Sequence, residues 1–230
     1  MRTEKVEMRP VLKYPGSKWK MAEWIISLMP PHKSYLEPFF GSGAVFFKKE
    51  PSRIETINDM DGEIVNLFRC IREEPEELMR CVTMTPYSRA EYEQAWGKFR
   101  FRAGVPSVGV EAARMTLVRY WQSHGSTSVY KGGWKNDRAG REYAYEISKR
   151  KGRQYVVDMV EDAEHIELLE ALKDHTGPVI LSGYDNELYD RHLQGWMKLH
   201  KKALAEGGGK RTETVWLNYE PQVTLIGDKL

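Results

Sequence analysis

The segment Glu37–Gly43, with the sequence E-P-F-F-G-S-G, has the residue types best suited to hold a ligand. Its glycines, Gly41 and Gly43, permit backbone conformations that other residues resist, and they let the main chain approach a ligand closely. The following A-V-F-F-K-K is typical of a helix start, whose free N–H groups would face the same ligand. Asp59 ends the next predicted strand, where a carboxylate can bind the hydroxyl pair of a ribose. This spacing predicts a nucleoside site, and a tight turn beside a solvent-facing acid remains the alternative.

The glycine turn differs from the pattern of nicotinamide enzymes. In G-x-G-x-x-G, a third glycine would fall where this chain has Val45 and Phe46. The turn is nearer to the F-x-G-x-G turn that binds a nucleoside without a pyrophosphate. S-adenosylmethionine is such a ligand.

A second candidate is the basic turn Lys13–Lys18, K-Y-P-G-S-K, which precedes a predicted helix. A lysine at the end of such a turn can pair with the carboxylate of an amino-acid ligand, and Lys18 is placed for that task. Taken alone, the turn is a weak signal that a surface loop explains better.

Helices and strands alternate around these residues, which predicts an α/β sheet. Helices are predicted at 20–30, 44–49, 62–72, 162–175 and 186–193, and strands at 34–38, 53–59, 177–183 and 213–220. Between about 75 and 150 the periodicity weakens, and helical patterns remain at 91–99 and 111–121. We therefore expect a sheet-forming domain, 1–74 and 146–230, and an inserted subdomain, 75–145.

Composition excludes several classes of protein. Hydrophobic residues make up 41% and charged residues 30% of the 230 residues, and no apolar run approaches the ~20 residues of a spanning helix. The N-terminus has no signal-peptide core, so a cytoplasmic location is expected. Two cysteines and six scattered histidines match no metal-ligand spacing, and we expect no metal site.

The net charge is only +2, so nucleic-acid binding would depend on local clustering. Lysine and arginine do cluster between 89 and 153, interleaved with Tyr, Trp and Phe. The pattern predicts a DNA- or RNA-binding surface, and a solvated flexible insertion is the alternative.

Five segments resemble, in order and spacing, the Dam-type DNA adenine methyltransferases. They are KYPGSK, EPFFGSGAVFF, INDMDGEIVNLFRCIR, VILSGYDNELYD and RTETVWLNYEP. The resemblance implies a Rossmann-like S-adenosylmethionine-dependent methyltransferase sheet with an inserted, mainly helical DNA-recognition subdomain. It also implies site-specific methylation of adenine N6, with S-adenosylmethionine as cofactor and double-stranded DNA as partner. A methyltransferase for RNA or small molecules is disfavoured by the order of the five segments.

The resemblance also assigns residues. In the family, the two turns contact the cofactor and the acid binds its ribose. The implied cofactor residues are Lys13, Tyr14, Gly16, Lys18, Glu37, Pro38, Phe39, Gly41, Gly43 and Asp59. Arg and Lys suit phosphates and guanine edges, Asn suits adenine, and an aromatic ring can fill the place of an extruded base. The candidates for DNA contact are Arg119, Tyr120, Lys131, Trp134, Asn136 and Arg138.

The catalytic tetrapeptide of the family, D-P-P-Y or N-P-P-Y, does not occur in this chain. Two segments that should flank it are separated only by Ile147, Ser148 and Lys149, where the resemblance predicts two strands, a helix and the catalytic loop. One missing strand would be central to the sheet, and its loss would leave its neighbours unpaired.

Three explanations remain open for this gap. The chain carries an internal deletion, the sequence omits residues that the protein contains, or another segment completes the sheet, such as one from a second copy. The first implies little or no transferase activity. The alternative function is therefore a catalytically inactive relative that acts as a DNA- or cofactor-binding module.

Overall fold

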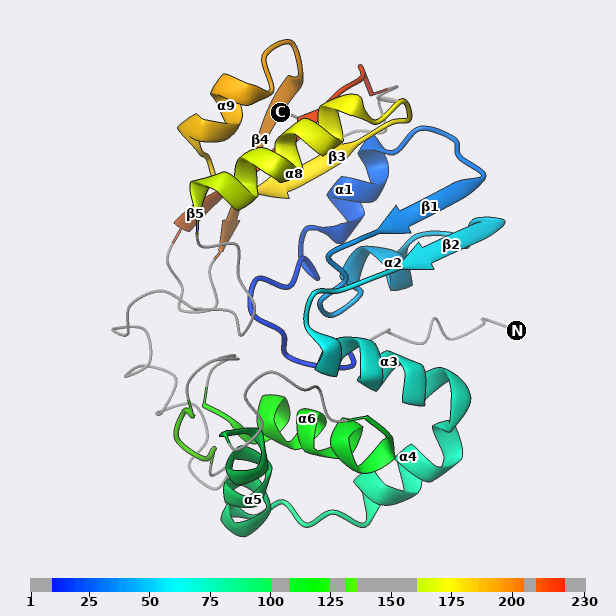
Figure 1. Ribbon diagram of the computed structural model, residues 1–230, viewed down its shortest axis with the longest axis vertical. Coiled ribbons are helices and arrows are strands. Elements are labelled where there is room, and N and C mark those ends of the chain that lie inside the picture. Colours follow the sequence, from blue (N-terminus) through cyan, green and yellow to red (C-terminus); the bar gives the residue numbers. More distant parts are fainter. Residues whose placement is uncertain (1–9, 101–107, 125–130, 136–160, 205–209, 222–230) are drawn as a thin grey trace, which may run out of the picture.

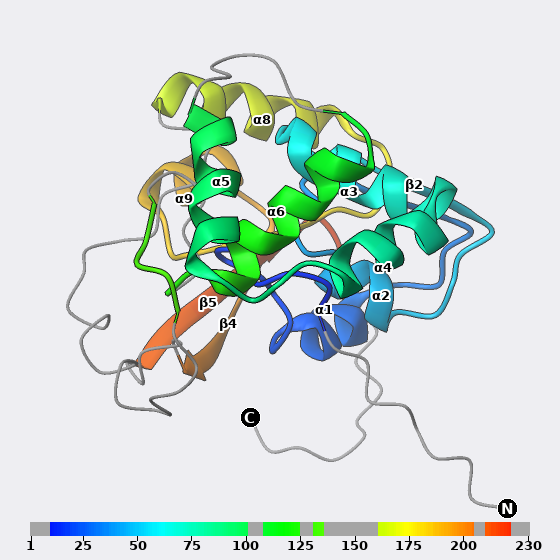
Figure 2. The ribbon, with the colours of Figure 1, turned by 90° about the horizontal axis from the view of Figure 1, so that it is seen from below.

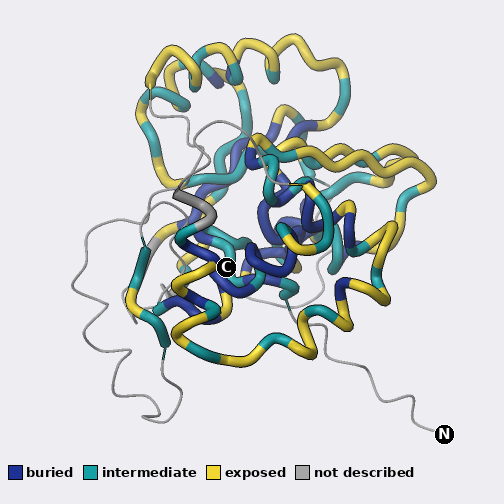
Figure 3. Tube along the Cα trace, turned by 60° about the horizontal axis from the view of Figure 1, so that its bottom comes forward, coloured by how far each residue is buried: buried dark blue, intermediate teal, exposed yellow. Residues whose placement is uncertain are grey.

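The computed structural model describes residues 10–100, 108–124, 131–135, 161–204 and 210–221. Three groups of elements follow one another from top to bottom in Figure 1: a C-terminal sheet with two helices, an N-terminal parallel strand pair, and a set of helices. Buried segments lie in the middle of the trace, with exposed segments around them (Figure 3).

The N-terminal group consists of α1 (Ala22–Leu28), β1 (Ser34–Glu37), α2 (Ala44–Lys48) and β2 (Ile54–Ile57). The strands are parallel and in register from Ser34 opposite Ile54 to Glu37 opposite Ile57. α1 buries Ala22, Ile25 and Leu28, which share one face because they are three residues apart. All four elements were predicted from the sequence, and the structure confirms them.

The C-terminal group consists of α8 (Asp162–Asp174), β3 (Ile180–Gly183), α9 (Glu187–His192), β4 (Met197–Leu204) and β5 (Lys210–Leu217). The strands form an antiparallel sheet in the order β3-β5-β4, so β5 is the central strand. The strand β4 was not predicted from the sequence, and its M-K-L-H-K-K-A-L begins with alternating apolar and basic residues, Met197 to His200. Such alternation suits an edge strand with one solvated face.

One apolar core joins these two groups, although their residues are far apart in the sequence. Met21, the N-cap of α1, and Ile25 within that helix pack with Val45 of α2 and with Val215 and Leu217 of β5. Because β5 covers α1, the C-terminal sheet fixes the position of the segment that precedes that helix.

The helical group consists of α3 (Gly62–Glu73), α4 (Pro75–Thr83), α5 (Arg89–Arg100) and α6 (Val110–Gln122), which Figure 2 shows side by side. The sequence patterns predicted α3, α5 and α6 but not α4. Asp61 is the N-cap of α3 and accepts a hydrogen bond from the backbone N–H of Glu63 at 2.9 Å.

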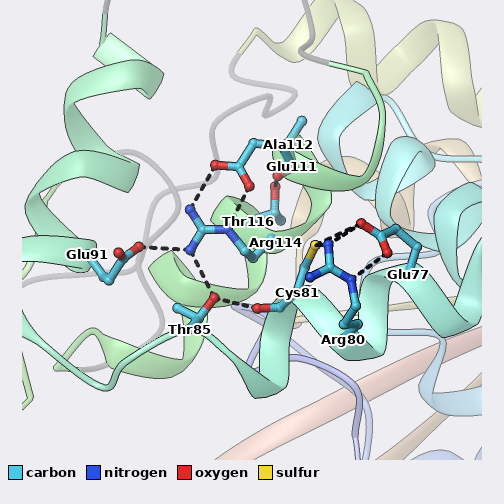
Figure 4. A network of polar contacts seen from close by, with 9 residues as sticks. All are labelled: Glu77, Arg80, Cys81, Thr85, Glu91, Glu111, Ala112, Arg114 and Thr116. Carbon is cyan, nitrogen blue, oxygen red and sulfur yellow. Dashed lines mark hydrogen bonds and ion pairs between the residues drawn. The ribbon is translucent and has the colours of Figure 1, made fainter.

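Arg114 holds the last three helices together (Figure 4). Its guanidinium donates two hydrogen bonds to Glu111 of α6, at 2.7 and 2.8 Å, and one to Glu91 of α5 at 2.8 Å. A further bond at 3.1 Å reaches Thr85, whose hydroxyl donates to the carbonyl of Cys81 on α4. Planar, multiply bonded arginine pairs impose geometry, so this contact fixes the mutual arrangement of the three helices.

The fold is therefore a mixture of helices and strands, as the sequence predicts. The described strands form two sheets, and a single Rossmann-like sheet stays a prediction, as do the boundaries of the inserted subdomain. None of the helices in the described ranges is long and apolar enough to cross a membrane.

Candidate functional site

The glycine turn connects β1 to α2 and has the backbone that its sequence predicts. Gly41 and Gly43 have φ angles of 51° and 64°, in the left-handed region that favours glycine. Phe40 anchors the turn because its ring packs edge-on against Phe68 of α3, with 4.7 Å between centroids. The neighbouring Phe39 is 47% exposed, so it remains available to a ligand.

Asp59 lies directly against this turn. One carboxylate oxygen accepts the backbone N–H of Gly41 at 2.6 Å, and the other accepts that of Asp61 at 2.9 Å. Each oxygen retains a second lone pair, which can accept a hydrogen bond from a hydroxyl group. The structure thus brings together two sequence signals that lie 18 residues apart.

The basic turn Lys13–Lys18 lies beside the glycine turn. The hydroxyls of Ser17 and Ser42 are 2.7 Å apart and share a hydrogen bond. The ring of Tyr14 covers Gly41 so closely that an added Cβ at Gly41 would lie 3.0 Å from it. Gly16 has a φ of 66°, so this turn also requires glycine.

Lys18 reaches across to the C-terminal sheet. Its ammonium lies 3.4 Å from the carboxylate of Glu213 on β5, 3.3 Å from the carbonyl of Gly16 and 5.9 Å from the ring centroid of Tyr184. Neither Glu213 nor Tyr184 was predicted from the sequence as a site residue. The signal for Glu213 was a single carboxylate in the otherwise apolar or uncharged run E-T-V-W-L. Lys13 lies elsewhere, with its ammonium 4.8 Å from the ring centroid of Trp121.

Glu37 ends β1 in a largely desolvated position. Burial raises the pKa of its carboxyl to about 7, against the opposing effects of a hydrogen bond from the Tyr35 hydroxyl, the Phe46 backbone and the Lys49 charge. Burial likewise raises the pKa of Asp61 to about 6. A cation close to a carboxyl group of this kind stabilises its charged form and lowers its pKa again. Pro38 is exposed beside Glu37.

These groups fit a nucleoside that carries a cation and an amino-acid end. Asp59 offers acceptors for ribose hydroxyls, Glu37 offers a carboxyl group whose charged form a bound cation would stabilise, and Lys18 offers a positive charge for a carboxylate. The positive-φ glycines allow close approach of the main chain.

Two predicted DNA contacts have buried side chains. Arg119 is 4% exposed, pairs with Glu63 of α3 and donates to the Thr116 hydroxyl at 3.3 Å. Tyr120 is 3% exposed, and its ring centroid lies 5.7 Å from that of Tyr14. Both side chains face the protein interior, which differs from the surface position that the DNA prediction assumed.

Two other candidates are only partly buried. Lys131 forms an ion pair with Glu93 of α5. Trp134 donates its indole N–H to Gln122 at 3.2 Å, and the guanidinium of Arg89 lies 5.6 Å from its ring centroid. Asn136, Arg138, Ile147, Ser148 and Lys149 lie outside the described residues.

Comparison with known proteins gives a family match over this region. The family model of the D12 class N6 adenine-specific DNA methyltransferases matches residues 14–140, just over half of the 230-residue chain. It covers the glycine turn, the basic turn from Tyr14 onward, Asp59 and the helices α3 to α6.

Individual relatives match shorter segments. The type II methyltransferase M1.LlaDCHI of Lactococcus lactis is 34% identical over 84 residues, which are 36% of this chain and 29% of the relative. A DNA adenine methylase of Haemophilus influenzae is 35% identical over 69 residues, 30% of this chain and 24% of the relative. A DNA adenine methylase of Vibrio cholerae is 29% identical over 70 residues, 30% of this chain and 25% of the relative. The matched segments thus span less than a third of the length of these relatives.

Proposed function

Because the chain belongs to the D12 class N6 adenine-specific DNA methyltransferases, we propose that it transfers a methyl group from S-adenosylmethionine to the exocyclic amine of adenine in duplex DNA. The bond from Gly41 to Asp59 is the observation that carries the proposal, because it joins a close-approach turn to a ribose-binding acid. The relatives named as DNA adenine methylases add to it.

The cofactor would lie along the two adjoining turns. Asp59 would accept hydrogen bonds from the ribose, and Lys18 would bind the carboxylate of the methionine part. Glu37 and Phe39 would border the sulfonium, while Gly16, Gly41 and Gly43 would allow close approach of the backbone. When bound, S-adenosylmethionine supplies an electrophilic methyl group.

Tyr14, Lys13 and Pro38 would act less directly in cofactor binding. Tyr14 packs on Gly41, and Lys13 lies over Trp121 of α6. Their contacts support the shape of the two turns and the segment around them. Pro38 restricts the chain between β1 and the glycine turn.

The fold in this proposal is a Rossmann-like sheet, formed by 1–74 and 146–230, with a helical recognition subdomain at 75–145. The strand order supports it, because β1–β2 and β3-β5-β4 are two pieces that a central strand could join. The catalytic tetrapeptide of the family would end such a strand.

DNA would contact the subdomain near the end of α6. Lys131 and Trp134 are partly exposed there, and Asn136 and Arg138 follow them in the sequence. Basic side chains would bind phosphates and Trp134 would stack on a base. The burial of Arg119 and Tyr120 argues for an indirect role for these two residues.

A second candidate function is a DNA- or cofactor-binding module without transferase activity. The absence of D-P-P-Y and N-P-P-Y from the sequence favours it, because the resemblance assigns to this tetrapeptide the task of holding the adenine amine beside the methyl group.

Two measurements decide between these functions. Calorimetric titration with S-adenosylmethionine, together with thermal unfolding, tests the cofactor site, because a ligand of the native state must raise its stability. Transfer of tritiated methyl groups to unmethylated duplex DNA tests the reaction. Binding with incorporation at adenine supports the methyltransferase, and binding without incorporation supports the binding module. Absence of both heat and stabilisation would overturn the cofactor assignment.

A further inference from the structure

Three consecutive residues at the end of α6 contact the segments that form the cofactor site. Arg119 pairs with Glu63, just after the Asp59–Asp61 loop. Tyr120 packs against Tyr14 in the basic turn. Trp121 donates its indole N–H to the carbonyl of Val11 at 2.7 Å. The contacts of Tyr120 and Trp121 join α6 to the N-terminal segment that holds the basic turn, and the pair of Arg119 with Glu63 joins α6 to the start of α3, 56 residues away.

The contact of Tyr120 continues to the ribose acid. Its ring packs on Tyr14, and Tyr14 in turn covers Gly41, whose backbone N–H bonds to Asp59. The four residues Tyr120, Tyr14, Gly41 and Asp59 therefore form a continuous row of contacts, which we call the tyrosine relay. The tyrosine relay therefore connects α6 of the helical group with Asp59 in the cofactor site.

The basic turn depends on such contacts for its shape. Residues 10–20 form neither helix nor strand, so no regular hydrogen-bond ladder fixes them. Tyr120 belongs to the same buried cluster as Leu12, which precedes the basic turn, and Phe40, which lies within the glycine turn. Because packed interiors are close to incompressible, a shift of α6 must move Tyr14 or open a cavity.

We propose that Tyr120 is a positioning residue of the cofactor site, and that through the tyrosine relay the occupancy of that site and DNA binding by the helical subdomain affect each other. The inference rests on the proposed function. It assigns Tyr120 a role inside the protein, in place of the direct DNA contact predicted from the sequence. Linkage requires the coupling to be reciprocal, so each ligand changes the affinity of the other by the same factor.

The first experiment measures the Kd of S-adenosylmethionine by calorimetry for the wild type, Tyr120→Leu and Tyr120→Phe. Leucine removes the ring from the relay and should weaken binding roughly tenfold, within the usual range of coupling between sites. Phenylalanine keeps the ring, so the affinity of Tyr120→Phe should stay within about twofold of the wild type. The matched control is Tyr92→Leu, because Tyr92 is as buried as Tyr120 but bonds to Ser123 and Gly132 instead of the basic turn.

Tyr92→Leu should lower the unfolding temperature without changing the Kd, which separates a positioning effect from general destabilisation. If Tyr120→Leu does not fold, Trp121→Phe tests the neighbouring contact between α6 and the segment that leads into the basic turn, at an exposed position. That change removes the hydrogen bond to Val11 and should weaken cofactor binding by about threefold, the value of a lost neutral hydrogen bond. Wild-type affinity in the folded Tyr120→Leu protein, or in Trp121→Phe where it replaces that variant, would overturn the inference.

The second experiment repeats the titrations with saturating unmethylated duplex DNA. In the wild type, the Kd of S-adenosylmethionine with DNA should differ from the Kd without DNA. In Tyr120→Leu, the ratio of these two Kd values should move towards one. A wild-type protein that binds the cofactor with the same Kd with and without DNA would contradict the coupling and leave the cofactor assignment intact. A wild-type protein that binds no cofactor at all would overturn the proposed function, and the inference with it.

Discussion

The ammonium of Lys18 lies 3.4 Å from the carboxylate of Glu213, and this ion pair joins the basic turn to the central strand of the C-terminal sheet. The two side chains are unequally buried, with 23% of Lys18 and 3% of Glu213 exposed. The lysine can therefore turn to solvent if the pair is broken, whereas the glutamate remains in the interior.

This inequality predicts an asymmetric response to substitution. Lys18→Met removes the cation beside a buried carboxylate and should lower the free energy of unfolding by about 3 kcal/mol. Glu213→Gln leaves a neutral amide beside a lysine that can be hydrated, and should lower it by about 1 kcal/mol. Urea unfolding at neutral pH measures both. Glu23→Gln, at the 86% exposed end of the Lys48 pair, is the control and should change stability by less than about 1 kcal/mol. Equal losses in the first two variants would refute the asymmetry.

Lys18 should also discriminate between ligands. If Lys18 binds the carboxylate of the methionine part, Lys18→Met should weaken the binding of S-adenosylhomocysteine roughly tenfold, as expected for a lost charge-assisted hydrogen bond. Binding of 5′-methylthioadenosine should not change, because this nucleoside lacks the amino-acid end. Competition against labelled cofactor gives both affinities. A similar loss for both ligands would mean that Lys18 supports the whole site through the shape of the turn.

Gly41→Ala tests the glycine turn. The new Cβ would lie 3.0 Å from the Tyr14 ring at a φ of 51°, so we expect a loss of about 1–3 kcal/mol and weaker cofactor binding. Gly97→Ala is the control, because Gly97 lies within α5 with open space around its Cβ position. That change should raise stability by about 0.5–1 kcal/mol. An unchanged affinity in Gly41→Ala would show that the turn does not approach the ligand.

Glu37 should make stability depend on pH. Its pKa is about 7 in the folded protein against 4.5 as its ordinary value, so the folded state binds more protons between these values. Stability should therefore fall as pH rises from about 4.5 to 7. Glu37→Gln should remove this effect and become more stable than the wild type by roughly 1–3 kcal/mol at pH 8, since each pKa unit corresponds to about 1.4 kcal/mol.

Urea unfolding at pH 5 and pH 8 measures the effect of Glu37→Gln. Glu50→Gln, at an exposed position close to Glu37 in the sequence, is the matched control. The advantage of Glu37→Gln over the wild type in free energy of unfolding should grow from pH 5 to pH 8. An advantage that shrinks as pH rises would contradict the sign of this prediction.

Lys131 should contribute to DNA binding through phosphate. Lys131→Gln should weaken binding to all duplex sequences and lower the slope of log affinity against log salt by about one. Fluorescence anisotropy over a range of salt concentrations gives the slope. Lys33→Gln, at an exposed position just before β1, is the control. If both variants keep the wild-type slope, Lys131 does not touch phosphate.

Local patterns in the sequence predicted much of this protein. Helical spacing gave α1, α3 and α6, and the left-handed backbone of Gly41 and Gly43 agrees with their role in the turn. The spacing from the glycines to Asp59 also placed the acid at the turn. These features were accessible because each depends on residues close together in the chain. The edge strand β4 was missed because its alternation of apolar and basic residues stops at Lys201. The helix α4 was also missed, although Pro75 at its first position and two acidic residues in its first turn are typical of a helix start.

The tertiary structure alone decided which face of α6 is buried and which residues meet across the chain. Helical periodicity shows that Arg119 and Tyr120 lie on a helix, but the packing of α3 and the basic turn against that helix buries both side chains. The pairing of Lys18 with Glu213 joins positions far apart in the sequence and depends on the C-terminal sheet covering α1. Such contacts depend on how whole helices and strands pack together, and patterns among neighbouring residues do not determine that packing.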